Sequence, residues 1–242
     1  MNRAAMLVVA LAGSVAGCRN PPGQPAPGSE VKAPAAITDF DRLYAASCSG
    51  CHGAGGKGGA AIALNDPVYL AIADDGTIRR VISNGVPGTA MPAFSRSAGG
   101  LLTDDQVHAI VNGIRGHWAR PDALQGAIPP PFAAQQRGHP GRGQTVFGTY
   151  CASCHGADGR GGAHASSIVD GSYLALVSDQ ALRTIVIVGR PELGAPDWRN
   201  DVPGRAMSDE EVTDVVAWLA GQRTEAPGQP YPGPQPIAGD SR

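Results

Sequence analysis

The chain has 242 residues, which favours two modest domains over one large core. Its formal net charge of −2 gives no bulk attraction to nucleic acid. No phosphate loop, catalytic Ser-His-Asp set or nucleic-acid module is recognisable in it, and its 34 glycines and 21 prolines indicate long loops.

The first 18 residues have the pattern of a bacterial secretory signal. An apolar run after Arg3 is too short to span a bilayer but suits the central region of a signal peptide. Small residues then lead into Cys18, which resembles a lipoprotein lipidation site; the alternative is ordinary cleavage beside an incidental cysteine. An unpaired thiol in an exported protein requires an explanation, so lipidation is preferred. We therefore expect a lipid-anchored protein on the periplasmic, exoplasmic face of a membrane, with residues 19–37 as a flexible tether.

The motif Cys-x-x-Cys-His occurs twice further along the chain. Two thiols at this spacing can form thioethers with the vinyl groups of one haem, and the adjacent histidine then lies beneath the iron as its proximal ligand. A thioredoxin-type site needs a βαβ pattern, which surrounds neither motif, and a structural zinc site would use all four thiols without requiring the two histidines. The sequence therefore predicts two covalent haem c groups. Their attachment residues are Cys48, Cys51 and His52, and Cys151, Cys154 and His155.

Hydrophobic periodicity predicts three helices in each repeat. The first leads into the haem motif, and a middle helix is expected over 75–83 and over 179–188. The last helix is marked by a capping box that begins at Thr103 in one repeat and at Ser208 in the other. An apolar stripe at helical spacing follows each box. The stripes are Val107, Ile110, Val111 and Ile114, and Val212, Val215, Val216 and Leu219.

The similarity of the two halves extends beyond the cysteines and indicates a tandem duplication. The expected domains cover 38–118 and 141–223. The Pro-rich residues 119–140 between them are interpreted as the interdomain linker. Residues 224–242 contain many prolines and glycines and are expected to form a disordered tail.

On these motifs and helices, both halves resemble class I c-type cytochromes, which are small all-α folds that wrap one haem. Two such domains in series resemble the dihaem carriers of bacterial respiratory chains and the dihaem subunit of some terminal oxidases. The resemblance implies electron transfer rather than substrate turnover. It also implies redox partner proteins, with an integral membrane respiratory complex among them.

The resemblance further implies a distal loop that presents a methionine to the iron. In the first half this residue is Met91, which precedes a proline in a polar, Gly-rich loop where a core methionine is not expected. Such His/Met ligation raises the haem potential relative to two nitrogen ligands.

The second half departs from this pattern, because the same register places Ala195 opposite Met91. Met207 is the only methionine of this half and is the candidate sixth ligand of the second iron. The open alternative is that Met207 aligns with Leu102 and covers the haem edge as an apolar residue. His164 lies so soon after the proximal histidine that a surface role is preferred.

Electron transfer, as a carrier or as a complex subunit, is thus the expected function. The alternative is a haem enzyme that uses an open coordination site at the second haem for a small ligand such as peroxide, although no distal acid or base is recognisable. Arg79, Arg80 and Arg183 are expected either to pair with haem propionates or partner carboxylates or to form a solvated helix face.

Overall fold

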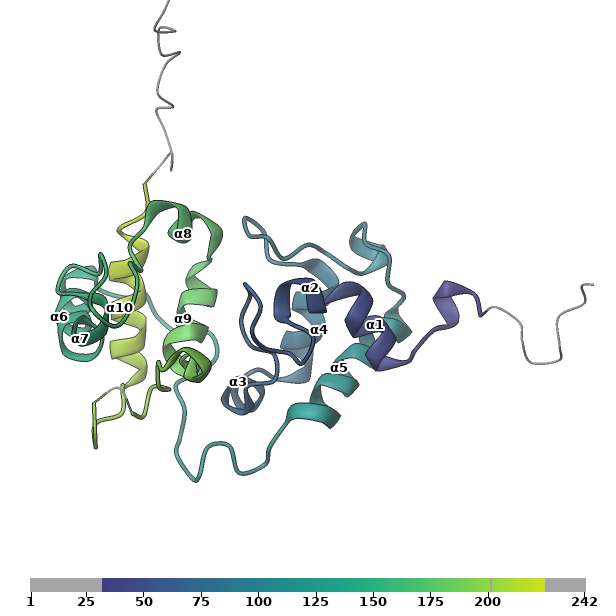
Figure 1. Ribbon diagram of the computed structural model, residues 1–242, viewed down its shortest axis with the longest axis horizontal. Coiled ribbons are helices and arrows are strands. Elements are labelled where there is room, and N and C mark those ends of the chain that lie inside the picture. The colour runs from purple at the N-terminus through teal and green to yellow at the C-terminus, as the bar shows by residue number, and fades with distance from the viewer. Residues whose placement is uncertain (1–31, 201, 225–242) are drawn as a thin grey trace, which may run out of the picture. The chain divides into compact units, whose positions relative to one another are not determined.

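The structure is a computed structural model that describes residues 32–200 and 202–224 (Figure 1). The chain divides after Ile37 into two units, of which the structure describes residues 32–37 and residues 38–200 and 202–224. The described part of the first unit forms one short 3-10 turn, Pro34–Ala36. In the described part of the second unit every regular element is helical, and β-pairing is limited to isolated bridges. The protein is therefore all-α, as expected; Cys18 lies outside the described residues.

The helices of the second unit occur in the same order in its two halves. The first half contains α1 Phe40–Ser47, α2 Ser49–His52, α3 Pro67–Ile72, α4 Asp75–Asn84 and α5 Asp104–Trp118. The second half contains α6 Pro140–Tyr150, α7 Ala152–His155, α8 Gly171–Leu176, α9 Asp179–Val188 and α10 Asp209–Ala220. The short 3-10 turns Arg96–Ala98 and Pro191–Leu193 precede the last helices. This shared order confirms the internal repeat.

Three helices per half were too few, because the short helices were not expected. The middle helices agree with α4 and α9, whereas α3 and α8 lie in segments for which no helix was expected. Asp66 caps α3 by accepting the backbone N–H groups of the second and third helical residues at 2.8 and 2.9 Å, and Pro67 occupies its first position. Six residues are too few to show an apolar period, so the signal for these helices lies in their caps.

The last helix of each half is fixed by its first turn. The Gln106 backbone N–H donates to Thr103 Oγ1 at 3.2 Å, and the Thr103 backbone N–H donates to Gln106 Oε1 at 3.0 Å. Ser208 and Glu211 repeat the exchange at 3.1 and 2.9 Å, so both capping boxes are confirmed. All eight stripe positions behind the boxes are buried, and burial stabilises the fold by about 1.5–3 kcal/mol for each such side chain.

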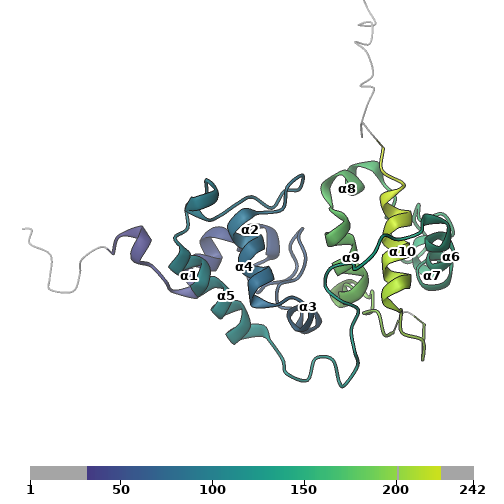
Figure 2. The same ribbon diagram turned by 180° about the vertical axis from the view of Figure 1, so that it is seen from behind.

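Helix α1 packs on α5, and α6 packs on α10 (Figures 1 and 2). At Gly143 in α6, a Cβ atom would lie 2.0 Å from the Asp214 carbonyl oxygen and 2.8 Å from Trp218 Cβ. At Gly113 in α5, a Cβ atom would lie 2.1 Å from Phe40 Cδ2. Glycine is therefore needed at both crossings. Each crossing sets the helix that leads into a haem motif against the last helix of its half.

The segment between the halves is bound to the second half through its carbonyl groups. The Arg183 side chain is 2% exposed and donates to the Pro131 carbonyl oxygen at 2.8 and 3.0 Å and to that of Phe132 at 3.2 Å. Gln180 Nε2 also donates to the Phe132 oxygen, at 2.7 Å. Arg183 and Gln180 of α9 thus donate hydrogen bonds to backbone carbonyl groups that have no partner within a helix.

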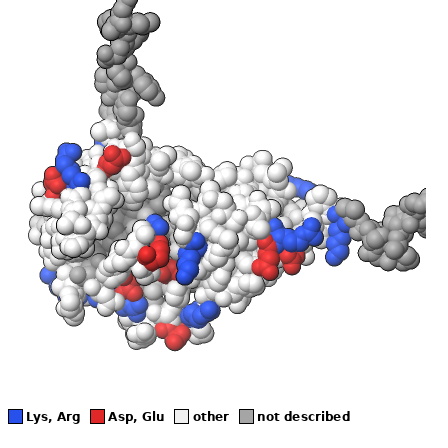
Figure 3. Space-filling view, in the orientation of Figure 1, with Lys and Arg blue, Asp and Glu red and all other residues white. Residues whose placement is uncertain are grey.

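Acidic and basic side chains are interspersed on the face drawn in Figure 3 and do not gather into a patch of one sign. This distribution agrees with the small formal net charge of −2. Over the part of the chain that the structure describes, no helix combines the length and apolarity that a membrane span requires.

Candidate haem sites

The two haem motifs form equivalent helical turns. Cys48 is the N-cap of α2, and Cys151 is the N-cap of α7. Positions i, i+3 and i+4 share a helix face, so both cysteines and the histidine of each motif lie on one side of their turn. This arrangement fits attachment of a haem by two thioethers, with the histidine directed at the same group.

Each motif histidine is oriented by a backbone carbonyl. His52 Nδ1 lies 2.8 Å from the Ile62 carbonyl oxygen, and His155 Nδ1 lies 2.9 Å from that of Ser166. A carbonyl only accepts, so each Nδ1 carries the hydrogen and Nε2 is left with its lone pair for a metal. Burial lowers the pKa of His52, against the opposing effect of its carbonyl partner, and so favours the neutral imidazole that ligation needs.

The chemistry of the thiols does not favour the alternatives to haem. Burial, together with the neighbouring Cys51 thiol, raises the pKa of Cys48 to about 11. A reactive redox cysteine has a lowered pKa, so Cys48 lacks the character of a thioredoxin-type nucleophile. Among the residues described, no three His, Cys, Asp or Glu side chains are grouped as a metal site would require.

The loop that carries Met91 is closed by its own hydrogen bonds. The Val86 N–H donates to the Met91 carbonyl oxygen at 3.0 Å, and the Met91 N–H donates to Thr89 Oγ1 at 3.2 Å. The Thr89 hydroxyl in turn donates to the Val86 carbonyl oxygen at 2.8 Å. The backbone at Met91 is therefore held, and its half-buried side chain projects from an ordered turn.

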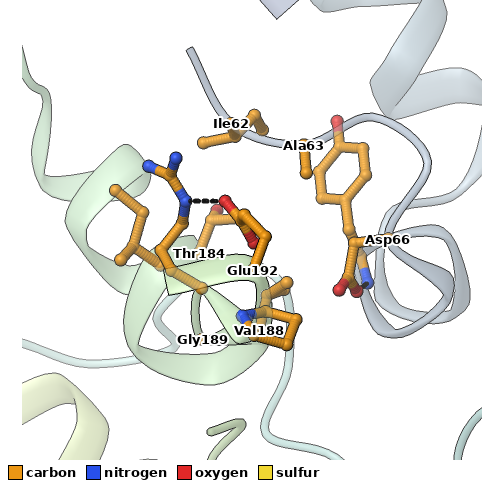
Figure 4. Close-up of a pocket in the computed structure, with 11 residues that line it drawn as sticks. Ile62, Ala63, Asp66, Thr184, Val188, Gly189 and Glu192 are labelled. Carbon is orange, nitrogen blue, oxygen red and sulfur yellow. Dashed lines mark hydrogen bonds and ion pairs between the residues drawn. The ribbon is translucent and has the colours of Figure 1, made fainter. Parts of the chain in front are cut away.

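The structure places Ala195 where the first half has Met91. The Arg190 N–H donates to the Ala195 carbonyl oxygen at 2.9 Å, as Val86 does to Met91, and the Ala195 N–H returns a bond to Arg190 at 3.1 Å. Arg190 Nε also donates to Glu192 Oε1 at 2.5 Å. Both residues line a small pocket that lies between α9 and residues 62–66 (Figure 4). The alignment of Ala195 with Met91, inferred from the sequence, is thus matched by equivalent backbone hydrogen bonds.

Met207 occupies the position that Leu102 has in the first half. The Leu102 N–H donates to the Phe94 carbonyl oxygen at 2.8 Å, and the Met207 N–H donates to that of Trp198 at 2.9 Å. Both residues stand directly before a capping box, and both are buried, at 7% and 3% exposure. This placement matches the apolar alternative for Met207.

The remaining histidines have local roles. His164 is exposed, and His139 caps α6 by accepting the Arg142 N–H at 3.4 Å. His108 pairs with Arg79 Nη2 at 2.8 Å, and the His117 ring packs on the edge of Phe40.

The expectation for Arg183 was wrong, because this side chain is buried rather than available to propionates, partners or solvent. It forms an ion pair with Asp209 and donates to Thr213 Oγ1 at 2.9 Å, in addition to the carbonyl groups between the halves. Nothing in its helical spacing distinguished it from a solvated arginine. The signal was indirect: Asp209, in the first turn of α10, and the carbonyl groups of the Pro-rich segment both lacked an evident donor.

An aromatic pair links the last helix to the first in each half. Trp118 packs edge-on against Tyr44, with centroids 5.2 Å apart, and Trp218 packs on Phe147 at 4.4 Å. Tyr44 and Phe147 each stand four residues before the first cysteine of a motif, so the repeat carried this signal. Both tryptophans therefore brace a haem-motif helix within their own half.

Known proteins resemble the two halves separately and together. Residues 35–112 match the family described as cytochrome C oxidase, cbb3-type, subunit III, and residues 141–223 match the family described as cytochrome c. A cytochrome bc1 complex cytochrome c subunit of Mycobacterium bovis is 25% identical over 218 residues, which are 88% of this chain and 73% of that protein.

Two oxidase subunits match over shorter stretches. The cbb3-type cytochrome c oxidase subunit CcoP of Azospirillum sp. is 32% identical over 126 residues, 48% of this chain and 38% of that protein. The corresponding subunit FixP of Sinorhizobium medicae is 29% identical over 175 residues, 67% of this chain and 54% of that protein. The chain thus spans about half or less of these two relatives.

Proposed function

The chain belongs to the c-type cytochromes, with two cytochrome c domains in tandem and two covalent haem c groups, and from this premise we propose that it transfers electrons within a membrane respiratory chain. The observation that carries the proposal is the duplicated haem turn, in which each histidine is held through Nδ1 by a loop carbonyl. The relatives named as subunits of bc1 complexes and cbb3 oxidases support a respiratory complex as the partner.

The attachment residues follow from the turn geometry. We assign the thioethers to Cys48 and Cys51 in the first domain and to Cys151 and Cys154 in the second. The proximal iron ligands are then His52 and His155. We assign the sixth ligand of the first iron to Met91, because its ordered loop holds the backbone in one conformation. The domains proposed remain 38–118 and 141–223, which the family matches overlap closely.

The protein contributes position and environment rather than bond chemistry. A bound haem supplies the one-electron couple. The thioethers keep the group in place, and the Nδ1 contact fixes the imidazole plane and raises the basicity of Nε2. Burial of His52, at 8% exposure, excludes water from the proximal side of the first site. A rigid site of this kind changes little on oxidation, which lowers the reorganisation that each electron transfer requires.

We further propose that Cys18 is lipidated and tethers the protein to the exoplasmic face of a bacterial membrane. The support is the signal-like sequence before Cys18, the only cysteine outside the haem motifs. Two or three acyl chains anchor stably where one does not. Cys18→Ser should move the holoprotein from the membrane fraction to the periplasmic fraction. Retention of this variant in membranes to the same extent as the parent would reject the anchor.

Reoxidation of the purified, reduced holoprotein tests the proposed function. We expect the pyridine haemochrome assay to give two haems per chain, and membranes containing a terminal oxidase to reoxidise both in a cyanide-sensitive way. A Cys48→Ala, Cys51→Ala variant, which retains only the second haem, separates the two contributions. Failure of the membranes to oxidise the parent protein, at full haem content, would reject the respiratory assignment.

A further inference from the structure

The distal side of the second haem lacks the side chain that the first half presents. Ala195 has the backbone hydrogen bond of Met91, so the two residues occupy equivalent points of equivalent loops. Alanine lacks the three heavy atoms by which methionine extends beyond Cβ, and a methyl group has no lone pair for a metal. To complete the coordination of the second iron, another residue of the second half would have to reach the space beside Ala195.

Met207 is buried in the hydrophobic core. Its side chain is 3% exposed, within the main apolar cluster, and its N–H is bound to the Trp198 carbonyl oxygen. The next residue, Ser208, begins the capping box of α10, so the backbone on this side is also fixed. Withdrawal of a buried methionine side chain from an apolar core leaves a cavity and is strongly unfavourable. Leu102, which cannot bind iron, fills the same place in the first half.

The carboxylates near Ala195 are already paired. Glu192 accepts from Arg190 at 2.5 Å, and Asp197 accepts from Arg199 at 2.5 Å. His164 belongs to the loop whose Ser166 carbonyl holds His155, which places it on the proximal side.

We infer that no side chain among the residues that the structure describes completes the coordination of the second haem, and that the space beside Ala195 is a binding site for a small, neutral diatomic ligand. This inference rests on the proposed function, because it requires a haem at the second motif. Its structural basis is the pair of equivalences, Ala195 with Met91 and Met207 with Leu102.

The class of ligand follows from size and hydrogen bonding. The three heavy atoms missing at Ala195 leave room for a molecule of two atoms. The Ala195 N–H is already donated to Arg190, and Pro196 has no N–H, so the backbone here offers no donor to a ligand. Dioxygen and peroxide depend on distal donors, whereas carbon monoxide and nitric oxide do not. The site therefore suits ligands of the second kind, with nitric oxide as the chemical class to expect in a cell.

Carbon monoxide titration of the dithionite-reduced holoprotein tests the inference. We expect one carbon monoxide bound per two haems. Ala195→Met should reduce this to none and should convert one ferric haem from high spin to low spin. Met91→Ala should raise it to two, which gives a second result should Ala195→Met fail to fold. The matched control is Met207→Leu, which conserves volume and should leave the value at one.

The outcomes separate the inference from the function on which it rests. Fewer than two haems per chain in the haemochrome assay would reject the second haem site itself. Two haems with no carbon monoxide bound to the parent would overturn only the present inference. If Met207→Leu then binds one carbon monoxide, Met207 is the sixth ligand. Circular dichroism and haem content confirm that each variant is folded and loaded.

Discussion

Substitution of Gly143 by alanine should destabilise the second domain, because this position has no room for a methyl group. The ideal Cβ would lie 2.0 Å from the Asp214 carbonyl oxygen and 2.8 Å from Trp218 Cβ. The first of these atoms is backbone of α10 and cannot rotate away, so α6 and α10 must separate. Overpacking of this kind costs about 1–3 kcal/mol, and the better helix propensity of alanine returns about 1 kcal/mol. We place the cost toward the upper end and expect a net loss of about 2 kcal/mol.

Thermal unfolding of the holoprotein, followed by far-ultraviolet circular dichroism, measures this loss. For a domain of this size, 1 kcal/mol corresponds to about 4–8 °C, so a melting temperature lower by about 8–16 °C is expected. Gly148→Ala is the matched control on the same helix, because that position is exposed and its Cβ would meet nothing within 4 Å. This control should raise stability by up to about 1 kcal/mol. A Gly143→Ala protein that melts at or above the control would refute the argument.

Three further outcomes are expected from the same assay. Arg183→Met removes a buried donor from Asp209 and from the carbonyl groups of residues 131 and 132, so it should lower the free energy of unfolding by about 3 kcal/mol. It should also speed proteolytic cleavage between the domains. An unchanged cleavage rate would contradict this role. Ser208→Ala should cost about 1 kcal/mol through loss of the cap, which Ser208→Asp should largely restore. Burial alone would raise the pKa of Asp214, but hydrogen bonds from Arg142 and His139 lower it below its ordinary 3.8. The stabilisation by this carboxylate is therefore present above about pH 4 and lost as the pH falls through the lowered pKa, so Asp214→Asn should flatten that limb of the stability profile.

The sequence predicted most accurately those features that depend on neighbouring residues. The capping boxes at Thr103 and Ser208 act within one helical turn. The apolar residues that follow them at helical spacing are buried, as that spacing predicts. The middle helix expected over 179–188 agrees with α9 to the residue. In each case the physical cause lies within a few positions along the chain, where a sequence pattern can show it.

Features that depend on tertiary contacts were less accessible. Arg183 has the spacing of a surface residue, and only the folded chain brings it to the carbonyl groups of the segment between the domains. The helix crossing at Gly143 was not predicted either, because a glycine near a helix start is also typical of a loop. For Met207, the sequence left two interpretations equal; the burial of this residue in the position of Leu102 was needed to favour one of them.

The unequal burial of the two motif histidines bears on the direction of electron flow. His52 is 8% exposed, whereas His155 is only partly buried, although both are held by the same kind of carbonyl contact. Because each histidine contacts a backbone carbonyl, this contact contributes equally to the two haem potentials and does not make them differ. A ferric haem carries one more positive charge than a ferrous haem, and access of water stabilises that charge. The second haem should therefore have the lower potential, so an electron that enters there would move downhill to the first.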